Sequence, residues 1–307
     1  MSVSVFLRFF LYLVVIACAF FTLDRTSGFF LNQLVKESGF RFSKLYKGGQ
    51  TADIVVLGNS RAVNGFFAPE MEKRTGQSVF HLGYNGMSTE ICEAIFLDYL
   101  EYNDTPYLLI LEITNLSVSN DLLKTLKLYA GMSDRIRTLT SRDNPRLNML
   151  CSITKLYRYN SELFLRSLYY IGKTDQKWIN TGNIDSKYAS AYRPADEDQV
   201  RNIYPVSGNN WEALLRLIEI CEEIGIDLKL VASPYLPGLR DNLSAYDIWR
   251  DRFMSKLPNP NMFHDYTDKL DDFSYFSDPL HINHKGASKF LQIMIVDQVF
   301  RQNTLSD

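Results

Sequence analysis

Two short segments far apart in the chain carry residue types that together can perform acyl transfer. In the first, the apolar residues 53–57 lead directly into a turn that bears Ser60. In the second, Asp278 precedes His281 by three residues in a turn that Pro279 keeps non-helical. A serine hydroxyl becomes a nucleophile when a base takes its proton, and an Asp that reaches the imidazole holds the required tautomer. The pattern predicts Ser60 as nucleophile, His281 as general base and Asp278 as its orienting partner.

Each segment also has an ordinary structural explanation. A serine at this place can simply cap the following helix, and an Asp-Pro bend with a loop histidine is common turn chemistry. The chain has four histidines. His81 and His264 fall within predicted strands, and His284 has no Asp at the same offset. His281 is therefore the strongest candidate base.

The elements that must position these residues alternate between apolar runs and helical patterns. Near-continuous apolarity predicts strands at residues 53–57, 78–82, 107–113, 227–233 and 261–266. Helical spacing predicts helices at residues 69–75, 89–102, 209–225 and 285–301. The expected fold class is α/β, a three-layer α/β/α sandwich around a parallel, flavodoxin-like five-stranded sheet, with the ligand crevice beyond the carboxyl ends of the strands.

The N-terminus begins with a segment that has to leave water. Residues 9–23 form an uninterrupted run of apolar and small residues between Arg8 and Asp24. Extended back through Val5, this run predicts a transmembrane signal anchor over residues 1–25, with Arg8 reaching the interface. A cleaved signal peptide and a lipoprotein signal at Cys18 are the alternatives. In each case the rest of the chain is expected outside the cytoplasm, and the anchor interpretation places a membrane-anchored main domain on the periplasmic or extracellular face.

The rest of the chain is predicted to form one main domain. A juxtamembrane linker at residues 26–50 leads into a domain at residues 51–307. Residues 121–205 do not follow the strand–helix alternation and are interpreted as a helical insertion, with one helix at residues 153–170.

Composition and charge exclude several classes of partner. The chain has 46% hydrophobic and 22% charged residues and a net charge of −2, which argues against a nucleic-acid partner. The four cysteines are scattered, and neither metal-ligand spacing nor a glycine-rich phosphate loop occurs. No metal and no cofactor are therefore expected.

Gly58-Asn59-Ser60 after the first strand, together with Asp278-x-x-His281 before the last helix, resembles the SGNH (GDSL-like) hydrolase superfamily. The resemblance implies an oxyanion hole made by a glycine after the second strand and an asparagine after the third. Gly86 in the block 82–88 and Asn115 in the block 111–115 are the matching residues. Asn59 stands where the family usually has Asp, and the third block lacks the full Gly-x-Asn-Asp form.

These departures are typical of an outlying member, closer to membrane-anchored SGNH proteins that handle acyl groups on cell-envelope polymers. The resemblance implies an ester hydrolase or O-acetyltransferase whose substrate is an acylated glycan or a small ester, with envelope-polymer assembly proteins as partners. A non-catalytic, glycan-binding assembly protein is the main alternative, and a lipid-active hydrolase with an apolar lid is a third. Arg61 either binds an anionic group of the substrate or makes a solvent contact at the helix start.

Overall fold

The computed structural model describes residues 3–113, 119–184, 206, 208–239 and 246–301. The chain divides into two compact units. The helical unit comprises Met1–Lys47 and Leu123–Thr174, and the sheet unit comprises Gly48–Leu122 and Asp175–Asp307. The residues that the sequence singles out for chemistry all belong to the sheet unit.

The sheet unit is built on five parallel strands, in agreement with the expected fold class. Their order across the sheet is β2-β1-β3-β4-β5, which is the flavodoxin-like order. The strands are β1 (Ile54–Leu57), β2 (Val79–His81), β3 (Leu108–Glu112), β4 (Asp227–Ala232) and β5 (Phe263–Asp265). Every residue of β1, β2 and β3 is buried, which explains why these strands are nearly continuously apolar in the sequence.

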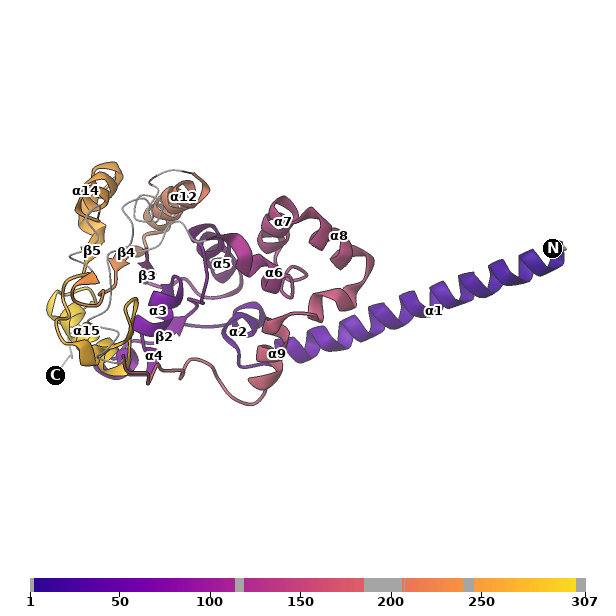
Figure 1. Cartoon of the computed structure of the whole chain (residues 1–307), viewed down its shortest axis with the longest axis horizontal. Coiled ribbons are helices and arrows are strands. Elements are labelled where there is room, and N and C mark those ends of the chain that lie inside the picture. The colour runs from indigo at the N-terminus through magenta and orange to yellow at the C-terminus, as the bar shows by residue number, and fades with distance from the viewer. Residues whose placement is uncertain (1–2, 114–118, 185–205, 207, 240–245, 302–307) are drawn as a thin grey trace. The chain divides into compact units, whose positions relative to one another are not determined.

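Helices cover both faces of this sheet. Figure 1 shows α5 and α12 on one side of the strands, where they pack against each other, and α4 and α15 on the other side. The bounds are α3 (Ser60–Gly65), α4 (Ala68–Thr75), α5 (Thr89–Tyr102), α12 (Asn209–Ile224), α14 (Tyr246–Lys256) and α15 (His284–Val296). The prediction of a three-layer sandwich is confirmed, although α3 and α14 were not among the predicted helices.

A small antiparallel hairpin precedes α15 and contains Asp278 and His281. It consists of β6 (Phe276–Asp278) and β7 (His281–Ile282), which follow the short 3-10 helices η3 (Pro260–Met262) and η4 (Phe273–Tyr275). The fully buried Asn283 then caps α15, because its side-chain oxygen accepts hydrogen bonds from the backbone N–H groups of Lys285 and Gly286.

The helical unit contains several short helices around the inner half of the long helix α1 (Val3–Lys36). The others are α2 (Arg41–Lys47), α6 (Leu123–Leu126), α7 (Asp134–Asp143), α8 (Pro145–Ile153), the 3-10 helix η2 (Lys155–Tyr159) and α9 (Glu162–Tyr169). The single helix predicted at residues 153–170 is therefore wrong. Asp24 of α1 accepts hydrogen bonds from the N–H groups of Lys155 and Leu156, and Ser161 caps α9, so the chain is interrupted twice.

The helix α1 is long and apolar enough to cross a membrane over Ser4–Lys36, a property that it shares with signal sequences. None of the residues in the most apolar part of this segment is buried in the protein. The C-terminal part of α1 differs in burial, because Asp24 and Val35 are buried in the helical unit. Residues 26–50, expected as a linker, thus contain the end of α1 and all of α2.

Candidate active site

The turn after β1 fixes the position of Ser60. Gly58 has a φ angle of +135°, and a Cβ there would lie 2.8 Å from the Glu112 Cβ and 2.9 Å from the Ala62 Cβ. Only glycine fits such a place without strain. Asn59 then caps α3, because its side-chain oxygen accepts a hydrogen bond from the Arg61 N–H at 2.8 Å. The alternative that Ser60 merely caps the helix is therefore wrong, and its side chain is left for another role.

The hairpin β6–β7 fixes the positions of Asp278 and His281. One carboxylate oxygen of Asp278 accepts hydrogen bonds from the backbone N–H groups of Leu280, at 2.9 Å, and His281, at 3.0 Å. The same carboxylate faces the His281 ring, with Nδ1 2.9 Å from Oδ2 and 3.0 Å from Oδ1. The spacing of three residues lets one short turn hold both the acid and the imidazole.

The structure brings the two segments together. His281 Nε2 lies 2.7 Å from Ser60 Oγ, so the hydroxyl, the imidazole and the Asp278 carboxylate form one continuous chain of hydrogen bonds. An ionised carboxylate can only accept hydrogen bonds, and this assigns the ring proton to Nδ1. The remaining nitrogen, Nε2, is then free to accept the Ser60 proton. This is the geometry that a serine nucleophile and its base require.

The pKa of Asp278 supports that assignment. Partial burial alone would raise the pKa of this carboxyl, but hydrogen bonds from the His281 ring and from the Leu280 and His281 N–H groups outweigh it. The net effect holds the pKa of Asp278 below its ordinary value. The carboxylate therefore stays charged at neutral pH and can stabilise an imidazolium beside it.

The other histidines have different surroundings. His81 is buried at the end of β2, and its Nε2 lies 3.1 Å from the Ala62 carbonyl oxygen. His264 lies within β5, where burial lowers the pKa of its ring. His284 is the first residue of α15. Of the four, His281 is the histidine whose ring meets Ser60.

Arg61 does not have the solvent-facing position from which it would bind a substrate, and this corrects the prediction from sequence. Its side chain is only 6% exposed, and its Nε lies 3.3 Å from Oε1 of the fully buried Glu112. Its two terminal nitrogens donate to the carbonyl oxygens of Leu280, at 2.6 Å, and of Ser233 and Pro234. The guanidinium therefore serves the fold of the site.

The Arg61–Glu112 pair connects the turn that bears Ser60 with the hairpin that bears Asp278 and His281. Arg61 follows Ser60 directly, and the carbonyl group that it holds belongs to Leu280, which directly precedes His281. The guanidinium also lies over the Tyr235 ring, with its carbon 3.9 Å from the ring centroid. The role of Glu112 is absent from the sequence prediction. The signal that could have indicated it is a charged residue at the end of the otherwise apolar strand β3.

A second network lies behind the nucleophile. The Asn64 side-chain amide donates to the Ser60 carbonyl oxygen at 2.6 Å. Asn180 in turn donates to the Asn64 side-chain oxygen, at 2.7 Å, and to the Ser277 hydroxyl, at 2.8 Å. Asn180 lies inside the segment expected as an insertion, so the last part of that segment, from Asp175 on, belongs to the sheet unit. The sequence offers no signal for this contact.

Of the two residues predicted to form the oxyanion hole, the structure describes Gly86 but not Asn115. The loop after β2 bonds to the nucleophile turn, because the Tyr84 N–H donates to the Gly58 carbonyl oxygen at 3.0 Å. Gly86 lies two residues later in an exposed turn, with a φ angle of +74°. Its role in an oxyanion hole stays a prediction. Asn115 lies outside the described residues.

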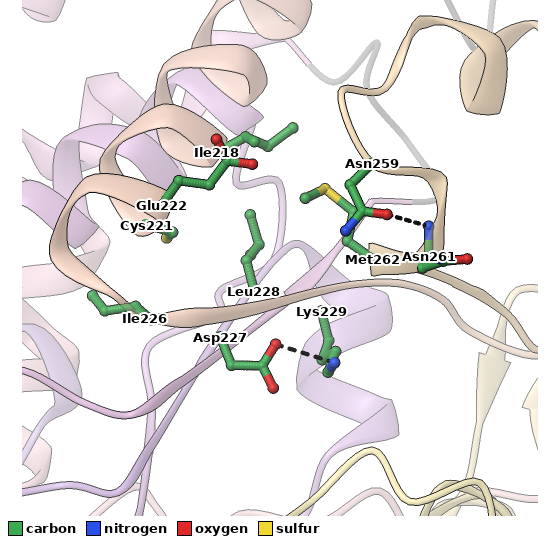
Figure 2. Close-up of a pocket in the computed structure, with 10 residues that line it drawn as sticks. All are labelled: Ile218, Cys221, Glu222, Ile226, Asp227, Leu228, Lys229, Asn259, Asn261 and Met262. Atoms are coloured by element: carbon green, nitrogen blue, oxygen red, sulfur yellow. Dashed lines mark hydrogen bonds and ion pairs between the residues drawn. The ribbon is translucent and has the colours of Figure 1, made fainter.

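No metal-binding group is found in the part of the chain that the structure describes, where three or more His, Cys, Asp or Glu side chains would have to meet. A pocket of about 250 Å³ lies between α12, the first residues of β4 and the segment 259–262 around η3, and Figure 2 shows its lining. Asp227 begins β4, and Met262 directly precedes β5, so this pocket is at the amino ends of the strands. Ser60 follows the carboxyl end of β1, at the opposite edge. None of the hydrogen bonds between the residues in Figure 2 connects a nucleophilic side chain to a histidine. The candidate active site is therefore the one at Ser60.

Comparisons with known proteins give only distant similarities. One family model matches residues 188–302, less than half of the chain, and its description names no activity. The search of curated proteins gives no match. A solved structure from Streptococcus pneumonia, named for platelet activating factor, has a TM-score of 0.38 and 11% identity, over 94% of this chain and 99% of that one. A GDSL-like lipase from Bacteroides thetaiotaomicron has a TM-score of 0.35 and 11% identity, over 84% and 94%. Both scores are too low to carry an argument about activity.

Proposed function

We propose that this chain is a membrane-anchored serine esterase of the SGNH type, in which Ser60 is the nucleophile. The observation that carries the proposal is the hydrogen-bonded chain from Ser60 Oγ through His281 to Asp278, with the 2.7 Å contact between Oγ and Nε2 at its centre. The strand-to-helix turn at Ser60 lies at the carboxyl edge of a parallel sheet, which is where α/β folds place their ligands.

The proposed reaction begins when Ser60 Oγ attacks the ester carbonyl carbon while its proton passes to His281 Nε2. The carbonyl oxygen takes the negative charge, and we assign its stabilisation to the N–H groups of Ser60 and Gly86 and the amide of Asn115. The tetrahedral intermediate then expels the alcohol, which receives the proton from Nε2, and leaves an ester on Ser60. Asp278 keeps Nδ1 protonated throughout.

The acyl-enzyme can pass its acyl group to water or to a sugar hydroxyl. The first outcome makes the protein a hydrolase, and the second makes it an O-acyltransferase. We favour an ester of a cell-envelope glycan or polymer as substrate, because α1 has the properties of a membrane anchor and the motifs resemble those of anchored SGNH proteins. In this proposal the main domain works outside the cytoplasm.

The proposal is tested with the full chain in detergent micelles. Hydrolysis of p-nitrophenyl acetate is measured for the wild type, for Ser60→Ala and for the control Ser255→Ala, which removes an exposed hydroxyl on α14. Mass spectrometry of the trapped protein reports acylation. We expect turnover and an acyl adduct in the wild type and in Ser255→Ala, and neither in Ser60→Ala. A folded wild type that is no faster than Ser60→Ala and never acylated would reject the esterase and favour the non-catalytic glycan-binding role.

A further inference from the structure

The length of the exposed part of α1 defines where a membrane would end. Residues 5–23 carry exposed apolar side chains on nearly every turn, interrupted by Arg8. At a rise of about 1.5 Å per residue they extend about 28 Å, close to the thickness of a bilayer's hydrocarbon core. Asp24, the next residue, is buried in the helical unit. With α1 as anchor, the boundary between hydrocarbon and headgroups lies near residue 24.

Short contacts hold the end of α8 at this same level. The Asp24 carboxylate accepts hydrogen bonds from the N–H groups of Lys155, at 2.8 Å, and Leu156, at 3.0 Å. Arg25 donates to the carbonyl oxygens of Ser152 and Ile153, both at 3.3 Å. Because an aspartate side chain is short, these bonds leave the junction between α8 and η2 little freedom to move along α1.

Further along α1, a close approach strengthens the same attachment. A Cβ at Gly28 would lie 2.8 Å from the Lys155 Cβ, and the Tyr159 hydroxyl donates to the Gly28 carbonyl oxygen at 2.8 Å. The 3-10 helix η2 therefore follows α1 for more than one turn. Figure 1 shows α8 at the edge of the helical unit nearest the free part of α1.

The free face of α8 is apolar. Its residues are exposed by 54% at Met149, 36% at Leu150 and 62% at Ile153. With the exposed Arg146 they stand at helical spacing on one face, while Leu147 and Cys151 face the interior. A short helix with an apolar face and a basic residue is the kind of element that lies in a membrane interface.

We propose that the exposed face of α8, formed by Arg146, Met149, Leu150 and Ile153, inserts into the headgroup region of the bilayer that α1 spans. The inference rests on the proposed anchoring by α1. The face is joined to α1 where its apolar segment ends, so lipid is the partner that the anchor itself brings to it. With both α1 and α8 attached to the same bilayer, the helical unit could not rotate freely relative to the membrane surface.

The test places single spin labels on the full chain in vesicles of phosphatidylcholine and phosphatidylglycerol. Cys18→Ala removes the exposed native thiol, and burial raises the pKa of Cys92, Cys151 and Cys221, which makes them poorly reactive. Labels are introduced by Ile153→Cys and Met149→Cys. Val14→Cys serves as the lipid reference, and Asp134→Cys, whose side chain is 85% exposed on α7, serves as the water reference. Electron paramagnetic resonance compares contact with oxygen and with a water-soluble nickel chelate.

We expect labels at residues 149 and 153 to favour oxygen over the nickel chelate, as the residue 14 label does, while the residue 134 label favours nickel. Labels at 149 and 153 that match residue 134, with residue 14 in lipid, would overturn the proposal, because this face of α8 would then lie in water. A residue 14 label in water would refute the anchoring itself, and with it the α8 contact, independently of whether the esterase is active.

Discussion

Two pairs of a basic and an acidic side chain lie in the sheet unit, and they differ in burial. Arg61 and Glu112 are 6% and 0% exposed, whereas His281 and Asp278 are 23% and 47% exposed. Both pairs border on Leu280, which follows Asp278 by two residues and gives its carbonyl oxygen to Arg61. The buried pair never has to exchange a proton, so it can serve as a fixed support. A pair that passes a proton to and from a substrate has to remain accessible.

The largest effect is expected at the accessible pair. His281→Ala leaves Ser60 without a base, and we expect kcat for p-nitrophenyl acetate to fall on the order of 10⁴-fold, about 5.5 kcal/mol in activation free energy. The free energy of unfolding should change little, because the ring is partly exposed. His284→Ala, three residues later at the start of α15, is the matched control and should retain most activity. Equal losses in the two variants would contradict the role given to His281.

The next effect is expected at the buried pair and concerns stability. Glu112→Gln leaves the Arg61 cation buried without its counter-charge, and we expect the free energy of unfolding to fall by about 3–5 kcal/mol in a urea titration. The control is Arg216→Ala, which breaks the surface pair between Arg216 and Glu93 and should cost less than about 1 kcal/mol. Similar costs in the two variants would show that Arg61 and Glu112 are not the support described.

A smaller loss of stability is expected when a methyl group is added at Gly58, next to Glu112 of the buried pair. Gly58→Ala places a Cβ 2.8 Å from that of Glu112 at a φ angle of +135°, and we expect a loss of about 2–3 kcal/mol in the free energy of unfolding. Gly86→Ala is the matched variant in an open turn, where nothing lies within 4 Å of the added atom. Its cost should be about 1 kcal/mol, from backbone conformation alone. Thermal or urea unfolding measures both, and an equal cost would remove steric contact as the explanation.

The same contrast shows what the sequence can and cannot predict. The strands and most helices of the sheet unit follow from local apolar patterns, and Asp278 and His281 are joined within one turn. The burial of Arg61 is not local, because its partners come from β3, from the segment after β4 and from the β6–β7 hairpin. The break in the helix predicted at residues 153–170 has a similar cause, since Asp24 binds that segment from about 130 residues away in sequence. Local sequence patterns predict neither of these contacts, because both join residues that are far apart in the sequence.

The smallest expected effect on stability is at the accessible pair, where one substitution separates the role of charge from that of position. Asp278→Asn exchanges the carboxylate for an amide that can donate to Nδ1, which favours the tautomer that cannot accept the Ser60 proton, so activity should fall at every pH. Its effect on stability should depend on pH. The pKa of Asp278 is lowered in the fold, so the charged carboxylate stabilises the wild type above its ordinary value near 3.8, and this gain is lost as the pH falls through the lowered value.

Urea unfolding at several pH values from neutral to acid, for the wild type and Asp278→Asn, measures that dependence. We expect a modest stability difference at neutral pH, screened by solvent because the carboxylate is half exposed, and its disappearance only below the ordinary Asp range. Asp268→Asn, an exposed carboxylate beside Lys269, is the control. A difference that persists unchanged into strong acid would mean that Asp278 stabilises the hairpin by its shape and not by its charge. Charge would then matter at this pair for catalysis alone, and only the buried pair would still link charge to the stability of the fold.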